Sequence, residues 1–326
     1  MDVANLLDPR VLLVTGKGGV GKSTVALALA MAGARTGLRT CLVEVEGRQA
    51  FAQLLETPPW DFTEREYRPG LFGMAIDPED SLLEYLDKFY GVRPLTRLVR
   101  TSAAVEFATA AAPGIKDVLT IGKVKEMERR RDSDGRFSYD LLVVDAPPTG
   151  RIVNFLRAPD ATTELVTVGP IRQQAQSLID MLLDPARTNL VLVTLLEEMP
   201  VTETIESAAA LRDLGLTLGP VIVNRVVPER LDDAGRKLLE GLDDDGLADL
   251  AALISDAGVA LDRDGAAALR DLGRVHLRRV DLQQRMREVL AARLRLPRLE
   301  LPYVPSSEFG AEEITRLARI IEEAVT

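Results

Sequence analysis

Cysteine and histidine are almost absent from the sequence. Its 326 residues include one cysteine, Cys41, and one histidine, His276. A lone thiol can form neither an internal disulfide nor a Cys-x-x-Cys zinc site, and it cannot supply the clustered thiolates that a soft metalloid requires. We therefore exclude disulfide-stapled folds and thiolate metal centres, and we interpret Cys41, within the apolar run 40–43, as a core residue.

Long hydrophobic runs and an excess of positive charge are also missing. The apolar stretch 25–34 is too short to span a bilayer, and the first residues lack the basic and apolar regions of a secretory signal. Lys and Arg number 40 against 50 Asp and Glu, a net charge of −10, which argues against a chain-wide nucleic-acid surface. We expect a cytoplasmic protein with no integral membrane segment and no nucleic-acid partner.

The sequence does contain regularly spaced short apolar runs. A hydrophobic content of 46% in 326 residues is enough for one large domain spanning 1–326. Apolar runs that alternate with helical segments predict a parallel sheet. The expected strands lie at 11–15, 39–45, 71–76, 139–145, 190–194 and 220–224.

Two regions lack strand signals and carry the apolar spacing of helices. The first, 78–136, is a candidate helical insertion, which Pro94 and Pro113 divide into separate helices. Its apolar residues form either a helix-packing core or an exposed groove. They include Leu82, Leu83, Leu95, Leu98, Val118 and Leu119. The second region, 228–296, is charged and mostly helical, with an Asp- and Gly-rich break at 241–246.

Segment 16–24 reads GKGGVGKST and matches the phosphate-binding pattern G-x-x-x-x-G-K-[ST]. It follows an apolar strand and precedes an Ala- and Leu-rich helix, as that pattern requires. Glycines let backbone N–H groups surround an anion at the helix N-terminus. The nucleotide-binding candidates are Gly16, Gly18, Gly19, Val20, Gly21, Lys22, Ser23 and Thr24. Lys22 reaches the β- and γ-phosphates, Ser23 ligates Mg²⁺, and Thr24 is placed for the α-phosphate. The predicted fold is α/β, a parallel-sheet P-loop NTPase core with an inserted α-helical subdomain.

A second lysine, Lys17, stands early in the loop. As a surface residue it is simply a solvated lysine. The segment, however, resembles the deviant Walker A motif of the MinD, ParA and ArsA class, in which the early lysine reaches across a dimer interface to the partner's phosphates. This resemblance implies that Lys17 is catalytic and acts like an arginine finger.

The acid at the end of a buried strand, Asp145, is the expected Walker B ligand of Mg²⁺. The segment that it begins, 145–151, reads DAPPTGR and resembles switch II of the ArsA family. That family includes bacterial arsenite-pump ATPases and the eukaryotic targeting factor for tail-anchored membrane proteins. Arg151 stands where the family has histidine.

Switch I of the family follows the second strand and carries an Asp-Pro-Ala-His segment. This sequence reads EVEGRQ at 44–49, and Glu46 is the candidate catalytic base. Glu44 points to the same side of an extended backbone, so either acid fits the role. The loss of Pro-Ala-His puts efficient hydrolysis in question.

The sequence indicates the binding site for the nucleotide's purine base less clearly. Asn224, at the end of a strand, resembles the family's base-reading asparagine, and Val304 and Pro305 resemble the loop that packs on the purine. An amide pairs with both edges of adenine, which favours ATP. Segments 112–117 and 196–204 are also similar to family segments, so the resemblance spans nearly the whole chain.

The resemblance implies a Mg²⁺-dependent ATPase whose nucleotide state drives a dimer and its helical subdomain, for protein targeting or chaperoning of a client. The partner is a second copy or a paralogue. Arsenite pumping is excluded by the single cysteine. Two alternatives stay open. One is a slow-turnover, nucleotide-gated scaffold that acts with a paralogous partner, and the other is a MinD/ParA-like positioning ATPase.

Overall fold

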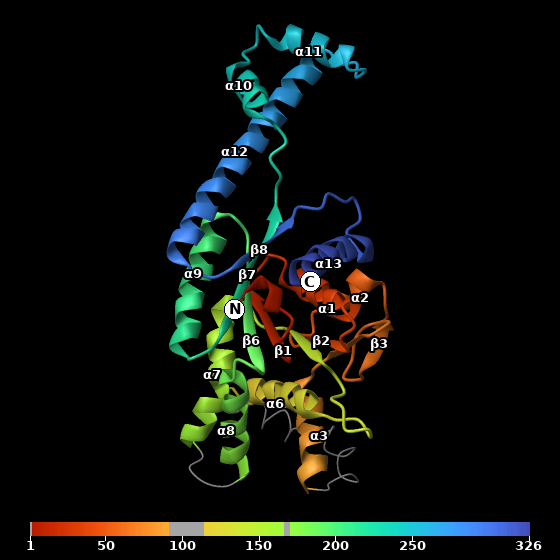
Figure 1. Ribbon diagram of the computed structural model, residues 1–326, viewed down its shortest axis with the longest axis vertical. Coiled ribbons are helices and arrows are strands. Elements are labelled where there is room, and N and C mark those ends of the chain that lie inside the picture. Colours follow the sequence, from red (N-terminus) through yellow and green to blue (C-terminus); the bar gives the residue numbers. More distant parts are fainter. Residues whose placement is uncertain (1, 91–113, 166–169) are drawn as a thin grey trace.

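A computed structural model describes residues 2–90, 114–165 and 170–326 of the chain (Figure 1). The predicted helix breaks at Pro94 and Pro113, and the apolar residues Leu95 and Leu98, lie outside the described residues. The described residues form a central sheet with helices on both faces and a helical arm that projects beyond it.

The sheet has eight strands in the order β3-β4-β2-β5-β1-β6-β7-β8. All neighbouring pairs are parallel except β3 and β4. The strands are β1 (Val11–Gly16), β2 (Thr40–Glu44), β3 (Arg65–Arg68), β4 (Leu71–Ala75), β5 (Leu141–Asp145), β6 (Thr188–Thr194), β7 (Leu218–Val226) and β8 (Arg298–Pro302). This arrangement confirms the predicted α/β class, and each of the six expected strands is present, whereas β8 was not assigned from the sequence.

Sequence reasoning missed β3. Its residues read REYR and are largely exposed, so they lack the apolar run by which a strand is recognised. The strand forms because it pairs antiparallel with β4 at the sheet edge, and Tyr67 stacks on the buried ring of Trp60 at a centroid distance of 4.5 Å.

Alternate residues of each strand point to opposite faces of the sheet. On one face, Leu12 and Val14 of β1 pack in a cluster with α1 (Lys22–Arg35) and α13 (Ala311–Val325). On the other face, Val11 and Leu13 pack in a second cluster with α12 (Arg263–Arg293) and with four other helices. These are α6 (Ile115–Arg129), α7 (Thr149–Leu165), α8 (Pro170–Leu183) and α9 (Glu198–Asp213). The core is thus two apolar layers, one on each side of the sheet.

Helices α3 (Pro78–Tyr90) and α6 are the helices that the structure describes in the region 78–136. Lys123 of α6 forms an ion pair with Glu84 of α3 at 2.7 Å. Val118 and Leu119 of α6 are half-buried, as are Leu82 and Leu83 of α3.

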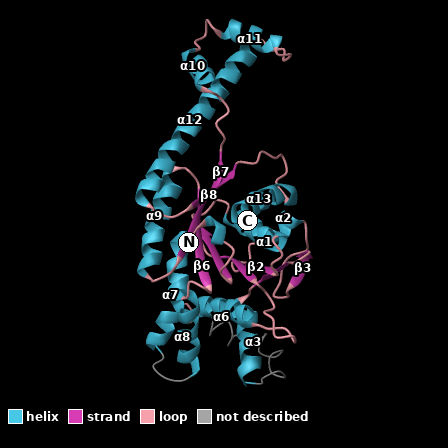
Figure 2. Cartoon of the chain, in the orientation of Figure 1, coloured by secondary structure: helices cyan, strands magenta, loops and turns pink. Residues whose placement is uncertain are grey.

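The connection from β7 to β8 forms the projecting arm (Figure 2). It consists of α10 (Asp233–Gly241), α11 (Leu247–Asp256) and the long helix α12 (Arg263–Arg293). Leu290, near the end of α12, is buried against the sheet, whereas α10 and α11 lie at the far end of the arm. Gly273 permits the close approach of α10, since a Cβ there would lie 2.6 Å from Leu239.

The described residues also form two short helices, η1 (Val3–Asn5) and α2 (Ala50–Leu55). In the described part of the chain, no helix combines the length and apolarity needed to cross a membrane.

Candidate nucleotide-binding site

The glycine-rich loop 16–24 joins the end of β1 to the start of α1 at the carboxyl edge of the sheet. Gly19 and Gly21 have φ values of +88° and +87°, which a side chain would strain. A Cβ on Gly16 would lie 2.2 Å from the carbonyl oxygen of Val193. Glycine is therefore required at these positions by the backbone itself.

The loop opens onto a pocket of about 410 Å³. The lining residues are Gly19, Gly21, Lys22, Ser23, Thr24, Arg48, Ala50, Gln53, Leu54, Arg225 and Phe309. Lys22 is only 6% exposed, and this burial lowers the pKa of its ammonium group. A desolvated cation at a helix N-terminus is suited to binding an anion such as a phosphate.

Ser23, which lines this pocket, contacts Asp145 at the end of β5. The hydroxyl of Ser23 donates to Oδ2 of Asp145 at 2.7 Å, while Oδ1 of Asp145 is buried and receives no hydrogen bond from the described residues. Burial raises the pKa of Asp145 to about 6, although the Ser23 hydrogen bond and the Lys22 charge act to lower it. A cation would relieve this penalty, because an unpaired buried carboxylate is costly.

These two side chains fit a magnesium ion that is shared with nucleotide phosphates. Mg²⁺ prefers oxygen ligands and is commonly held by one or two carboxylates together with phosphates. In the described part of the chain there is no group of three or more His, Cys, Asp or Glu side chains that would hold a metal on its own. Burial raises the pKa of the Cys41 thiol, so this residue is suited to the core and not to metal binding.

Glu44 and Glu46 differ sharply in their surroundings. Glu44 is paired in register with Asp145 across β2 and β5. Its Oε1 accepts from the Ala50 N–H at 3.1 Å, and burial raises its pKa. Glu46 instead forms ion pairs with Arg48 at 2.6 Å and with Arg151 at 3.4 Å. The two acids are thus separated into a buried carboxyl beside Asp145 and a carboxylate held by arginines.

Lys17 lies at the edge of the P-loop and forms an ion pair with Glu203 of α9 at 2.6 Å. Glu203 also accepts a hydrogen bond from the hydroxyl of Thr149, the first residue of α7. One carboxylate therefore connects the P-loop, the segment after Asp145 and helix α9. Sequence reasoning placed Glu203 in a segment similar to a family motif but gave it no role.

Asn224, at the end of β7, is buried and contacts the P-loop directly. Its Nδ2 donates to the carbonyl of Val20 at 2.9 Å, and its Oδ1 accepts from the Arg225 N–H at 2.9 Å. Both the nitrogen and the oxygen of the Asn224 amide are therefore hydrogen-bonded to backbone groups of the protein. Val304 is half-buried and packs on the core, and Pro305 is exposed. Phe309, in the same loop, is the aromatic residue that lines the pocket.

Six further pocket residues were missed from the sequence, and they include Arg48, Arg225 and Phe309. Arg225 has a φ of +54°, and its neighbour Asn224 was recognised only by its place at the strand end. Arg48 lies within the switch I segment, and its positive charge was the one sequence feature that could have indicated a place in a phosphate-binding pocket. Phe309 carries no local signal, because its position depends on how the loop after β8 returns to the P-loop.

The parallel sheet, the glycine-rich loop between β1 and α1, and the acid that ends β5 together define a P-loop nucleoside triphosphatase fold. Residues 9–182 and 168–243 match the sequence profile of the anion-transporting ATPases, the ArsA family. The chain belongs to this family.

Among its relatives, ATPase BagA of Mycobacterium tuberculosis (strain H37Rv) is 44% identical over 303 residues, which cover 90% of this chain and 87% of the relative. An arsenical pump-driving ATPase of Escherichia coli is 27% identical over 269 residues, 76% of this chain and 45% of the relative. The corresponding protein of Acidiphilium multivorum is 27% identical over 241 residues, 68% of this chain and 40% of the relative.

Proposed function

We propose that the protein binds ATP with Mg²⁺ at the P-loop pocket and hydrolyses it, and that the nucleotide state controls a dimer and its helical region 78–136. The observation that carries the proposal is that one site holds both a desolvated lysine, Lys22, and a buried carboxylate, Asp145. One oxygen of this carboxylate has no hydrogen-bond partner among the described residues. One group is suited to phosphate and the other to a metal ion. ATPase relatives and family membership support the same activity.

In this proposal the backbone of 16–21 surrounds the phosphates, Lys22 neutralises the β- and γ-phosphates, and Thr24 contacts the α-phosphate. Ser23 and Asp145 hold the metal, which when bound supplies positive charge to the reacting phosphate. Phe309 provides an aromatic surface for the base, beside Val304 and Pro305. Asn224 supports the site by holding the carbonyl of Val20.

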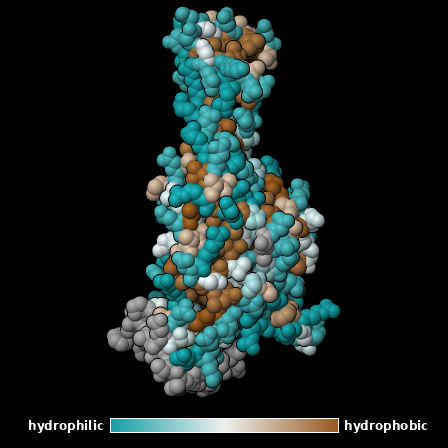
Figure 3. All heavy atoms as spheres, turned by 60° about the vertical axis from the view of Figure 1, so that its left-hand side comes forward, coloured by the Kyte–Doolittle hydropathy of each residue, from teal (hydrophilic) through white to brown (hydrophobic). Residues whose placement is uncertain are grey.

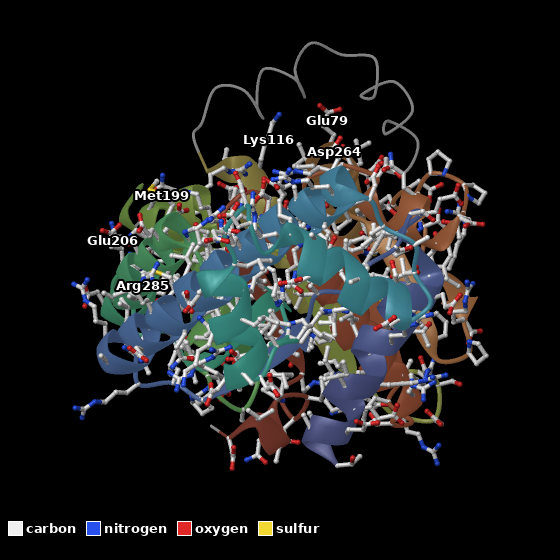
Figure 4. All side chains as sticks on the ribbon, turned by 90° about the horizontal axis from the view of Figure 1, so that it is seen from above. Glu79, Lys116, Met199, Glu206, Asp264 and Arg285 are labelled. Atoms are coloured by element: carbon white, nitrogen blue, oxygen red, sulfur yellow. The ribbon has the colours of Figure 1, made fainter. Side chains whose placement is uncertain are left out.

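The first test is Lys22→Ala. Loss of this charge should weaken ATP binding by about 10- to 100-fold, the usual value of a hydrogen bond to a charged group, and should abolish turnover. Lys116→Ala is the matched control, because Lys116 of α6 is exposed and points away from the body of the molecule (Figure 4). Nucleotide affinity by calorimetry and phosphate release are the measurements. Wild-type protein that binds no nucleotide would refute the proposal.

The dimer is part of the proposal because Lys17 resembles a residue that acts across an interface. Lys17 is held by Glu203 within the same chain, and Glu203 is also bonded to Thr149. If Lys17 exchanged Glu203 for the phosphates of a partner, whether a second copy or a paralogue, Glu203 would keep Thr149 as its partner and lose the charge that balances it. Nucleotide binding and rearrangement of α7 would thereby be linked.

A protein client requires an exposed apolar surface. In the described part of the chain, the exposed large apolar residues gather mainly on the arm, where apolar side chains are visible at the tip (Figure 3). They include Leu238, Leu253, Val259, Leu269, Leu272 and Val275. We therefore place a client contact on the arm as well as on the region 78–136.

A slow-turnover scaffold is the second candidate. It is favoured by the ion pairs of Glu46 with Arg48 and Arg151, since a carboxylate whose two oxygens both face guanidinium groups is not positioned to orient a water molecule. Turnover of the pure protein, with and without a paralogous partner, separates the two candidates. Turnover that stays near zero although ATP binds tightly would favour the scaffold.

A further inference from the structure

Four charged side chains form a continuous series of ion pairs beside the P-loop. Arg48 Nη2 lies 2.6 Å from Glu46 Oε2, and Glu46 Oε1 lies 3.4 Å from Arg151 Nη1. Arg151 Nη2 in turn lies 3.0 Å from Asp117 Oδ1. The series begins in the loop after β2, passes through the first turn of α7 and ends in the first turn of α6. It links the P-loop pocket to the helical region 78–136.

The loop that carries Arg48 has positive φ angles on both sides of this residue, and hydrogen bonds to the core hold it in place. Gly47 and Gln49, on either side of Arg48, have φ values of +61° and +57°. Gln49 accepts from the Trp60 N–H at 2.7 Å and donates to the Trp60 carbonyl at 2.9 Å, and Trp60 is itself buried. Non-glycine residues with positive φ persist where their surroundings hold them, and they gather at functional sites. The core therefore fixes this loop beside the pocket.

Arg48 lines the pocket together with Lys22 and Ser23. Two cations on one pocket repel each other unless an anion lies between them. The guanidinium is 55% exposed, so it is free to change partners. Planar guanidinium groups bind phosphate through paired N–H donors.

We propose that Arg48 binds the terminal phosphate of ATP in cis, and that it exchanges Glu46 for this phosphate when ATP binds. The inference rests on the proposed ATPase function. Arg48 lines the pocket with Lys22 and Ser23, the groups assigned to the terminal phosphates and the metal, and this favours the terminal phosphate over the α-phosphate.

The exchange has a consequence for the rest of the series. After Arg48 has left, Glu46 still forms its ion pair with Arg151, and Arg151 forms an ion pair with Asp117 on α6. The occupancy of the terminal phosphate position is then transmitted to α6 through two ion pairs. ADP lacks that phosphate and leaves Arg48 with Glu46.

The experiment compares Mg·ATP and Mg·ADP affinities of wild type and Arg48→Gln by calorimetry. We expect ATP affinity to fall at least tenfold and ADP affinity to fall less than threefold, and we expect Arg48→Lys to restore part of the preference for ATP. Arg136→Gln is the control, because Arg136 is an exposed arginine whose ion-pair partner is the nearby Asp134. It should leave both affinities unchanged.

The link to α6 is tested with Asp117→Asn. This variant should bind ATP as wild type does, but the change in hydrogen exchange that ATP induces in 115–129 should disappear. Equal losses of ATP and ADP affinity in Arg48→Gln, or no loss, would overturn the phosphate role. A retained exchange response in Asp117→Asn would overturn the link. In either case Lys22→Ala would still report on ATP binding itself, so the proposed function is judged separately.

Discussion

Asp145 shows how burial prepares a carboxylate for a metal ion. The side chain stands at the end of a strand buried on both faces, beside Ser23 and in register with Glu44. Desolvation raises its pKa to about 6, so near neutral pH the protein holds a charged carboxylate in an unfavourable environment. Such a penalty, on the order of 3 kcal/mol for a shift of this size, is offset when a cation binds.

Asp145→Asn should therefore stabilise the protein in the absence of Mg²⁺ and nucleotide. The folded-state pKa lies above the ordinary value of 3.8, so the wild-type free energy of unfolding falls as the pH rises from about 4 to about 6, and the penalty is fully present above that range. The gain from the substitution should be large at pH 7.5 and small at pH 4.5, as measured by urea denaturation.

Asp8→Asn is the control for this titration, because Asp8 is exposed and its substitution should give a small difference at both pH values. An Asp145→Asn variant whose gain is the same at pH 7.5 and pH 4.5 would contradict the assignment of the penalty to this carboxylate.

Helix α1 packs closely on the sheet because it has a glycine, Gly33, at the point of contact. Gly33 lies against β2 and β5, where a Cβ would come within 2.8 Å of Thr40 Oγ1 and 2.9 Å of Leu141 Cδ2. Gly122 is also helical, in α6, but nothing lies within 4 Å of its Cβ position. The packing of α1 fixes the P-loop at the helix start, so close contact along the helix contributes to the geometry of the pocket.

Gly33→Ala should destabilise the protein by about 1–3 kcal/mol, because the added methyl group overpacks the contact with the sheet. Gly122→Ala should stabilise it by up to about 1 kcal/mol, because alanine is the better helix former. Midpoints of urea denaturation for the two variants test the pair. Shifts of the same sign would show that the approach of α1 to the sheet is looser than described.

At the scale of the whole molecule, our proposal links the nucleotide state to the dimer and to the region 78–136. The ion pair between Lys17 and Glu203 joins the P-loop to α9, and because both side chains are 29% exposed, solvent weakens the pair and it contributes modestly to stability. Lys17 is therefore able to leave Glu203 for a phosphate at small cost.

Lys17→Ala should keep ATP binding within about threefold of wild type, since Lys22 and the loop backbone remain. Its turnover should fall by on the order of 100-fold, as when one transition-state donor is removed, and ATP-dependent association should be lost in analytical ultracentrifugation. Lys237→Ala, in the arm, is the control. Normal turnover together with normal association in Lys17→Ala would remove the cross-subunit role.

The sequence by itself determined the parts of this protein that depend on neighbouring residues. Buried parallel strands appear as continuous apolar runs, which is why 139–145 and 190–194 were recognised. The P-loop was recognised because its glycines and Lys22 are contiguous. The strand β3 was missed because REYR becomes a strand only through its pairing with β4.

Tertiary structure alone decided which distant charges meet. Lys17 and Glu203 are 186 positions apart, and Arg151 and Glu46 are 105 apart. It also separated Glu44 from Glu46, which the alternation of an extended chain had placed on one side. Such contacts depend on how strands and helices pack, and the free energy of each pair is too small to leave a pattern in the sequence.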